Sequence, residues 1–329
     1  MGSIDLKKYD LRSDLIIESN LDVKHLEYKE ENISVDYVHL NKDNLGKRKG
    51  DYITISFLDI TDSNNFNKVF KVLNRELKKI FKLSNIKDND KCLIIGLGNN
   101  KSTPDSLGFE VLKNIIVTRH LDELNLMDRK YRSVACLEPS VIGNTGIDSF
   151  DIIEGVNKKI KPDFVIVIDS LAAINISRIE KTIQISNTGI SPGSGIGNNR
   201  PELSFESLGC KVIAIGIPTV VSSAVIVNDT INYLTKKISY QKNNLTKSKM
   251  ISPNNLNYLK EESDLSNFEK EKLLGIIGTL SDSEIKSLVY EVLNPIGYNL
   301  IVSTKEIDFM IEKFGKLIGM SLNECLHKN

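Results

Sequence analysis

Unbroken apolar runs recur through the middle of the chain and predict buried strands. The runs are Cys92–Ile95, Phe164–Ile168 and Val212–Ile217, and they are rich in β-branched residues. Runs without polar alternation are typical of strands covered on both faces, as in parallel sheets. Shorter or alternating runs predict further strands at residues 33–40, 52–57, 133–137 and 182–185.

Apolar residues at helical spacing lie between these runs. They predict helices at residues 65–83, 109–116, 150–160 and 227–238. Because strands alternate with helices, we predict an α/β fold with a doubly wound, mostly parallel sheet flanked by helices.

The last third of the chain has a different pattern. Residues 241–264 are polar and rich in Lys and Asn, which predicts a surface insertion or linker. Helical spacing returns afterwards and predicts a helical C-terminal region over residues 267–326. Residues 1–20 are polar and show no periodicity, as in a frayed terminus.

Composition excludes several classes of function. The 329 residues carry 43 Lys and Arg against 43 Asp and Glu, so no global basic field favours nucleic acid as a partner. No apolar stretch is long enough for a membrane span, and no signal peptide precedes the first strand, so we expect a cytoplasmic protein. The four cysteines are far apart and predict reduced structural thiols.

Two aspartates are candidate catalytic residues. Asp105 and Asp169 each follow an apolar strand and are flanked by small residues. Since parallel strands end at one edge of a sheet, the two carboxyl groups could meet there and serve as general acid and general base. Spacing alone favours the simpler interpretation that each is a capping residue.

Two glycine-rich loops accompany the aspartates. Gly96, Gly98 and Asn99 follow the first strand, and Gly193 and Gly195 follow the run at 182–185. The loops lack both the GxGxxG fingerprint and a Walker lysine, so a nucleotide-binding domain is poorly supported. We expect these residues to shape a substrate pocket and expect no cofactor.

Other catalytic chemistries find less support. No GxSxG, HxH or HExxH motif is present, and no metal site is predicted. His120 is the one histidine beside a candidate loop, and we predict it as a supporting residue of the substrate pocket. A site combining it with carboxylates would give a metal-assisted alternative.

Ten short motifs, in order along nearly the whole chain, resemble the germination protease family of endospore-forming bacteria. Among them are YDLRSDL at 9–15, GLGN at 96–99, TPDSLG at 103–108, VTRHL at 117–121, KPDFVIVIDSLAA at 161–173 and TIQISNTGISPGSGIGN at 182–198. The resemblance implies an aspartic-type endopeptidase with a fold akin to hydrogenase-maturation proteases. It places the family's catalytic aspartates at Asp105 and Asp169.

The resemblance also implies a substrate and a processing step. The family degrades small acid-soluble spore proteins in the spore core, acts as a homotetramer and is made as a zymogen. Here the implied propeptide is residues 1–14, removed by self-cleavage between Asp14 and Leu15, and the peptidase domain is residues 15–329.

Four positions depart from the family pattern. Ile174 replaces an Arg, Asn187 an Asp, Ser191 a His and Ser222 an Asp. These departures keep open a divergent member with weak or no activity that binds spore proteins without cutting them.

Overall fold

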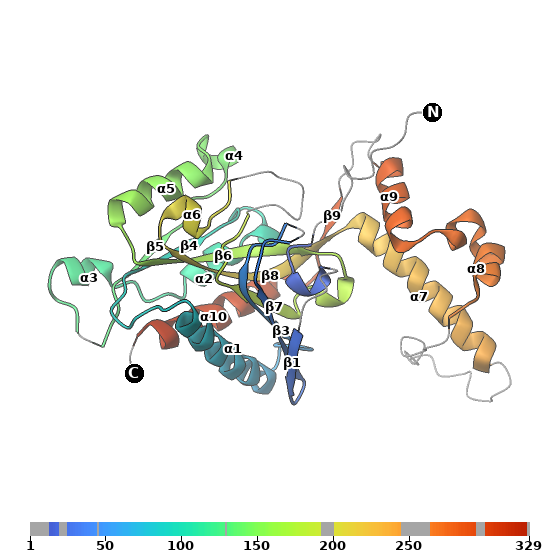
Figure 1. Cartoon of the computed structure of the whole chain (residues 1–329), viewed down its shortest axis with the longest axis horizontal. Helices are drawn as coiled ribbons and strands as arrows, with labels where there is room; N and C mark the ends of the chain where they lie inside the picture. The colour runs from blue at the N-terminus through green and yellow to red at the C-terminus, as the bar shows by residue number, and fades with distance from the viewer. Residues whose placement is uncertain are drawn as a thin grey trace. The chain divides into compact units, whose positions relative to one another are not determined.

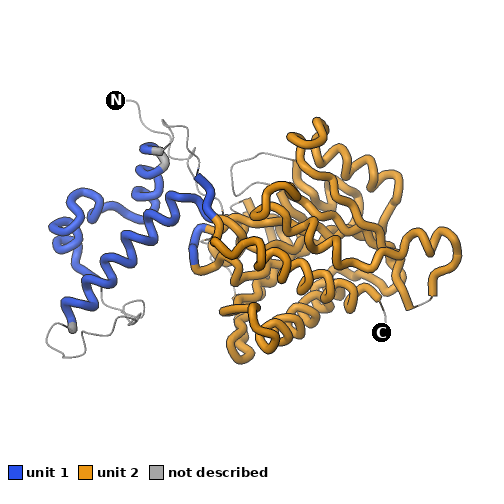
Figure 2. The backbone as a smooth tube through the Cα atoms, turned by 180° about the vertical axis from the view of Figure 1, so that it is seen from behind, with its two compact units in different colours: residues 1–11, 174–176, 221–302 blue, residues 12–173, 177–220, 303–329 orange. Residues whose placement is uncertain are grey.

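The computed structural model describes residues 13–19, 25–44, 46–128, 130–191, 201–244, 264–293 and 300–327. The chain divides into two compact units, shown in two colours in Figure 2. The sheet unit comprises residues 12–173, 177–220 and 303–329, and the helical unit comprises residues 1–11, 174–176 and 221–302.

Within the described residues, a sheet of nine strands has the order β1-β2-β3-β7-β8-β6-β4-β5, with β9 paired to β8. The strands are β1 (His25–Glu30), β2 (Ile33–Leu40), β3 (Gly50–Ser56), β4 (Cys92–Gly96), β5 (Val134–Leu137), β6 (Phe164–Ala173), β7 (Thr182–Ser186), β8 (Lys211–Ser222) and β9 (Ile301–Val302).

The sheet is mixed, so the prediction of a mostly parallel sheet is wrong. Strand β4 pairs in parallel with β5 and β6. The ladder β1-β2-β3-β7-β8 is antiparallel throughout. The early strands are joined by short turns, which permit antiparallel pairing without a helical crossover. The α/β class itself is confirmed.

Helices cover both faces of this sheet (Figure 1). Helices α1 (Ser63–Leu83), α2 (Leu107–Leu112) and α10 (Ile307–Leu326) bury their apolar stripes in one core with alternate strand residues. Helices α5 (Ser149–Ile160) and α6 (Phe205–Leu208) build a second core on the other face. The short helices α3 (Arg119–Glu123) and α4 (Ile142–Thr145) complete the unit.

The central strands are longer than their apolar runs. β6 continues past Asp169 to Ala173, and β8 continues through Pro218 to Ser222. The predicted strands end at the first polar residue or proline, because the prediction rests on apolar runs. The backbone stays extended beyond these residues, because neighbouring segments still form hydrogen bonds with it. The Pro218 carbonyl, for example, accepts the N–H of Glu180 at 2.9 Å.

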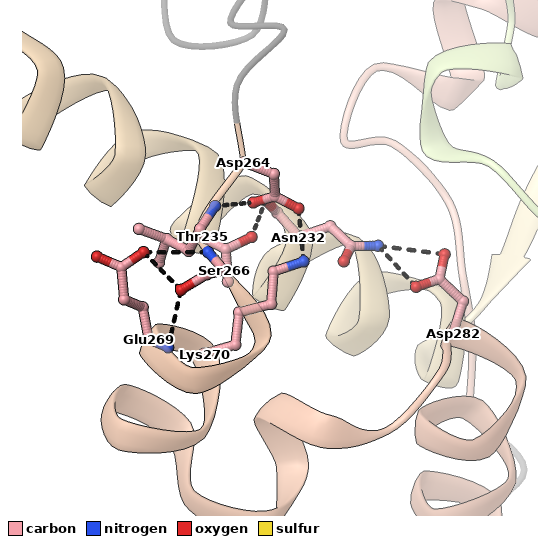
Figure 3. Close-up of polar contacts among 8 residues, drawn as sticks. Asn232, Thr235, Asp264, Ser266, Glu269, Lys270 and Asp282 are labelled. Atoms are coloured by element: carbon pink, nitrogen blue, oxygen red, sulfur yellow. Dashed lines mark hydrogen bonds and ion pairs between the residues drawn. The ribbon is translucent and has the colours of Figure 1, made fainter.

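The helical unit contains α7 (Ser223–Asn244), α8 (Asn267–Leu274), a 3₁₀ turn η7 (Gly275–Thr279) and α9 (Asp282–Leu293). Ser266 and Glu269 form a reciprocal capping box at the start of α8. Figure 3 shows this box, the Lys270–Asp264 ion pair at 2.5 Å, and Asn232 of α7 bonded to Asp282 of α9. The predicted insertion at 241–264 begins inside α7, and its residues 245–263 lie outside the described part.

No helix among the described residues is both long enough and apolar enough to cross a bilayer.

A close backbone contact joins α2 to the end of β4, and it gives a stability prediction. A Cβ added at Gly108 would lie 2.4 Å from the Leu97 carbonyl oxygen. We expect Gly108→Ala to destabilise the protein by about 1–3 kcal/mol, because backbone cannot move aside cheaply. Denaturant unfolding measures the change.

Gly155, on the exposed side of α5, is the matched control, since an added Cβ meets nothing within 4 Å. Gly155→Ala should stabilise by about 0.5–1 kcal/mol through helix propensity. Effects of the same sign at both positions would contradict the argument.

Candidate active site

Asp169 lies on β6, which is a central strand of the sheet between β8 and β4. The preceding residues alternate: Phe164, Ile166 and Ile168 face the α1/α10 core, whereas Val165 and Val167 face the α5/α6 core. Because side chains alternate along a strand, Asp169 continues the α5/α6 face. Its side chain is 6% exposed, and its Oδ1 accepts the N–H of Ser170 at 2.9 Å. Asp169 is therefore held close to the protein interior.

Asp105 ends the 3₁₀ turn η3 (Thr103–Asp105), which follows β4. The Asp105 carbonyl accepts the N–H of Asn99 at 2.8 Å, and its own N–H donates to Ser102. From β8, the buried Thr219 hydroxyl donates to the Pro104 carbonyl at 2.7 Å. The loop carrying Asp105 is thus held by its own backbone hydrogen bonds and tied to β8 by Thr219.

The pairing of β4 with β6 places the two aspartates at the same edge of the sheet. Gly96, the last residue of β4, pairs with Ile168, and the Leu97 N–H donates to the Ile168 carbonyl at 2.9 Å. Asp169 is the next residue on β6, and η3 contacts β6 directly. The parallel pairing is the topology that the sequence-based expectation requires, and the meeting of the two carboxyl groups stays a prediction.

The glycines predicted for the pocket permit these close contacts. Gly98 has φ +105°, and an added Cβ would lie 1.9 Å from the Asp105 carbonyl oxygen and 3.0 Å from its Oδ1. At Gly96 an added Cβ would lie 2.6 Å from the Gly108 carbonyl oxygen. Asn99 Oδ1 accepts a hydrogen bond from Nδ2 of Asn144 in α4 at 3.1 Å, and this contact helps to hold the loop in place.

The predicted cleavage segment lies against the same strand. The Asp14 N–H donates to the Ala172 carbonyl at 3.3 Å, and the Ala172 N–H donates to Asp14 Oδ2 at 2.9 Å. Ala172 is beyond Ile168, the last β6 residue paired with β4. Leu15 is fully buried, and Ile16 packs with Val38, Leu40 and Tyr52.

Residues that the sequence reasoning missed contact this segment. The Asp14 carbonyl oxygen accepts from Lys47 Nζ at 2.8 Å and from Gln184 Nε2 at 3.0 Å. Both side chains line a pocket together with Asp14, Leu171 and Gly216. No local motif marks Lys47 or Gln184, because 33 and 170 residues separate them from Asp14.

The structure does not bring His120 to the aspartates. His120 is an exposed residue of α3, and Thr118 before this helix bonds to Val134, whose partner in β4 is Cys92. His120 therefore lies by the amino ends of the strands, at the opposite edge of the sheet. Gly193 and Gly195 lie outside the described residues.

Neither a metal cluster nor a reactive thiol is found in the described part of the chain. No three His, Cys, Asp or Glu side chains there are grouped to hold a metal ion. Burial raises the pKa of the Cys136 and Cys325 thiols to about 12 and that of Cys210 to about 11. Thiols of this kind are inert, so these cysteines are structural.

Comparison with known proteins points to one family over nearly the whole chain. The family model described as germination protease matches residues 9–329. Similar curated proteins, each named germination protease, come from Priestia megaterium (39% identity, 98% of this chain and 95% of the relative), Geobacillus sp. (39%, 99% and 96%) and Bacillus cereus (40%, 98% and 95%).

Two of the four positions predicted to depart from the family pattern have clear partners. Asn187 Nδ2 donates to Asp51 Oδ2 at 2.8 Å, and Asn187 Oδ1 accepts the Asp51 N–H at 2.8 Å. The Ser222 hydroxyl accepts the N–H of Ala224 at the start of α7. Ser191 lines the pocket beside Asp14, and Ile174 follows the end of β6.

The environment of Asp51 makes an asparagine at position 187 favourable. Burial raises the pKa of Asp51, but hydrogen bonds from Tyr37, His39 and Asn187 outweigh this and lower it. A group whose folded pKa is lowered contributes stability above its unfolded pKa and loses it as pH falls through the folded value.

We therefore predict that Asn187→Asp destabilises the protein by about 2–4 kcal/mol at pH 7, because it removes a donor and sets two carboxylates together. Because two adjacent carboxylates raise the pKa of one of them, the loss should shrink as pH falls through that raised pKa and be small by about pH 4, where an unfolded Asp also takes up a proton. Urea unfolding at pH 7 and pH 3.5 measures both effects. Asn187→Ala, which adds no charge, should show a smaller pH dependence; equal dependence in the two variants would contradict the prediction.

Proposed function

The chain belongs to the germination protease family and is an endopeptidase, and from this premise we propose that it begins the degradation of small acid-soluble spore proteins at germination, using Asp105 and Asp169 to activate water. The observation that supports this proposal is the parallel pairing of β6, which carries Asp169, with β4, after which η3 carries Asp105 and contacts β6. The coverage of nearly the whole chain by the family supports it.

The chemistry follows from the pairing of two carboxyl groups. Close carboxyl groups do not both ionise easily, so one proton is shared between them. The ionised group accepts a proton from a water molecule as that water adds to the peptide carbonyl carbon. The protonated group donates to the leaving amide nitrogen, and the peptide bond breaks into a carboxylate and an amine.

The same site would process its own chain. In this proposal residues 1–14 form a propeptide, and cleavage falls between Asp14 and Leu15. The pairing of Asp14 with Ala172 supports this, because Ala172 lies on β6 only three residues after Asp169. An extended segment that occupies this edge would also exclude another substrate. The tetrameric assembly and the spore-core location stay predictions from the family resemblance.

Removing either carboxylate tests the proposed chemistry. Asp105→Asn and Asp169→Asn should each lower the rate of cleavage of a small acid-soluble spore protein by about 10²–10⁴-fold, since an amide cannot transfer the proton. Fragments are followed by gel and mass spectrometry. Asp151→Asn, an exposed aspartate in the first turn of α5, is the matched control and should be as active as wild type.

Full activity in both aspartate variants would refute the proposed roles of Asp105 and Asp169. Wild-type protein that binds the spore protein and releases no fragment would instead identify a binding protein.

The processing site gives a separate prediction. Incubated full-length protein should acquire Leu15 as its first residue, because the Asp14–Leu15 peptide is held against β6. N-terminal sequencing reads this directly, and Asp169→Asn should keep its original terminus. Any other first residue would place the cleaved bond elsewhere.

A further inference from the structure

We infer that Lys47 and Gln184 are the carbonyl-binding residues for the bond that this protein cleaves in its own chain. This inference rests on the proposed cleavage between Asp14 and Leu15. The Asp14 carbonyl oxygen, which belongs to that bond, accepts hydrogen bonds from Lys47 Nζ at 2.8 Å and Gln184 Nε2 at 3.0 Å. Two donors on one carbonyl oxygen are the arrangement that stabilises the anion formed in acyl transfer.

Gln184 is oriented by a second hydrogen bond. Its Oε1 accepts the Ile16 N–H at 2.6 Å, so its Nε2 faces Asp14. The side-chain amide thus contacts backbone groups on both sides of Leu15. Gln184 lies on the face of β7 opposite Ile183 and Ile185, which belong to the α1/α10 core. This is the α5/α6 face, where strand alternation also places Asp169.

Lys47 supplies a half-buried cation. Its ammonium group also donates to the Ser13 carbonyl at 2.8 Å, so it spans two consecutive peptide oxygens. Burial lowers the pKa of Lys47, while Asp14 and Glu18 act in the opposite direction. A half-buried cation at a carbonyl oxygen interacts more strongly with developing negative charge than an exposed one, because water screens it less.

These donors fit the electron movement of the proposed reaction. When water adds to the Asp14 carbonyl carbon, the π electron pair moves to the oxygen, which becomes an alkoxide. Lys47 and Gln184 stabilise that oxygen until the pair returns and the C–N bond to Leu15 breaks. The leaving nitrogen takes a proton, giving a new carboxylate on Asp14 and a new amine on Leu15.

The recognition uses backbone groups alone. Asp14 O and Ile16 N exist in every peptide, so the two side chains would place other substrates in the same register. The adjoining pocket, lined also by Leu171 and Gly216, has room for water beside the carbonyl.

The test is self-processing of the full-length chain, followed over time by intact mass and N-terminal sequencing. Lys47→Met keeps the length of the side chain and removes the cation; Gln184→Glu keeps an acceptor for Ile16 and removes the donor to Asp14. We expect each to slow the appearance of the Leu15 terminus by about 10²–10³-fold. Lys49→Met, at an exposed lysine two residues away, is the matched control and should process at the wild-type rate.

The pH dependence separates a chemical role from a structural one. The wild-type rate should fall at alkaline pH as Lys47 loses its proton, because its pKa is lowered. Lys47→Arg keeps a cation to higher pH, so this alkaline fall should disappear while processing continues. Thermal unfolding of each variant shows whether it is folded.

The outcomes distinguish this inference from the function on which it rests. Wild-type processing at Leu15 that Lys47→Met and Gln184→Glu leave unchanged or accelerate would overturn the carbonyl-binding roles alone, and would show that the contacts only restrain the arm. Wild-type protein that never acquires the Leu15 terminus would overturn the proposed self-cleavage, and the inference with it.

Discussion

The parallel pairing of β4 with β6 is the constraint on which the rest of the site depends. The last residue pair between the two strands is Gly96 with Ile168. The loop that carries Asp105 begins directly after this pair. From there Gly98 and Gly108 allow backbone to approach backbone, with no space for a Cβ at either position. A one-residue slip would turn Asp169 to the other face of the sheet, because side chains alternate with a period of two.

Polar groups at this edge are satisfied both from a distant strand and from within the same loop. Thr219 of β8 holds the Pro104 carbonyl, and Asn99 holds the Asp105 carbonyl. A buried hydrogen bond of this kind contributes modestly to the free energy of unfolding. Removing one partner costs about 1–3 kcal/mol, because the other polar group stays buried without a partner. The loop is therefore positioned by β8 and by its own internal hydrogen bonds.

The segment around Asp14 uses the same edge, and its contacts are of two kinds. Burial of Leu15 and Ile16 anchors the segment, but the hydrophobic effect is non-directional and does not fix the position of the backbone. Hydrogen bonds to Ala172, Lys47 and Gln184 then set the register of the backbone. The division resembles that of peptide binding along a strand, in which the backbone supplies the hydrogen bonds and pockets take the side chains.

The sequence by itself determined the α/β class and most of the strands and helices, and it singled out the two aspartates as candidates, because apolar periodicity and strand-end position are local properties. It did not determine strand direction: the antiparallel half of the sheet depends on which strands become neighbours. Nor did it reveal that Lys47 and Gln184 meet Asp14 or that His120 lies at the opposite edge. Only the tertiary structure decided these, because a contact between residues far apart in the chain arises from packing of whole elements and leaves no periodic trace in the sequence.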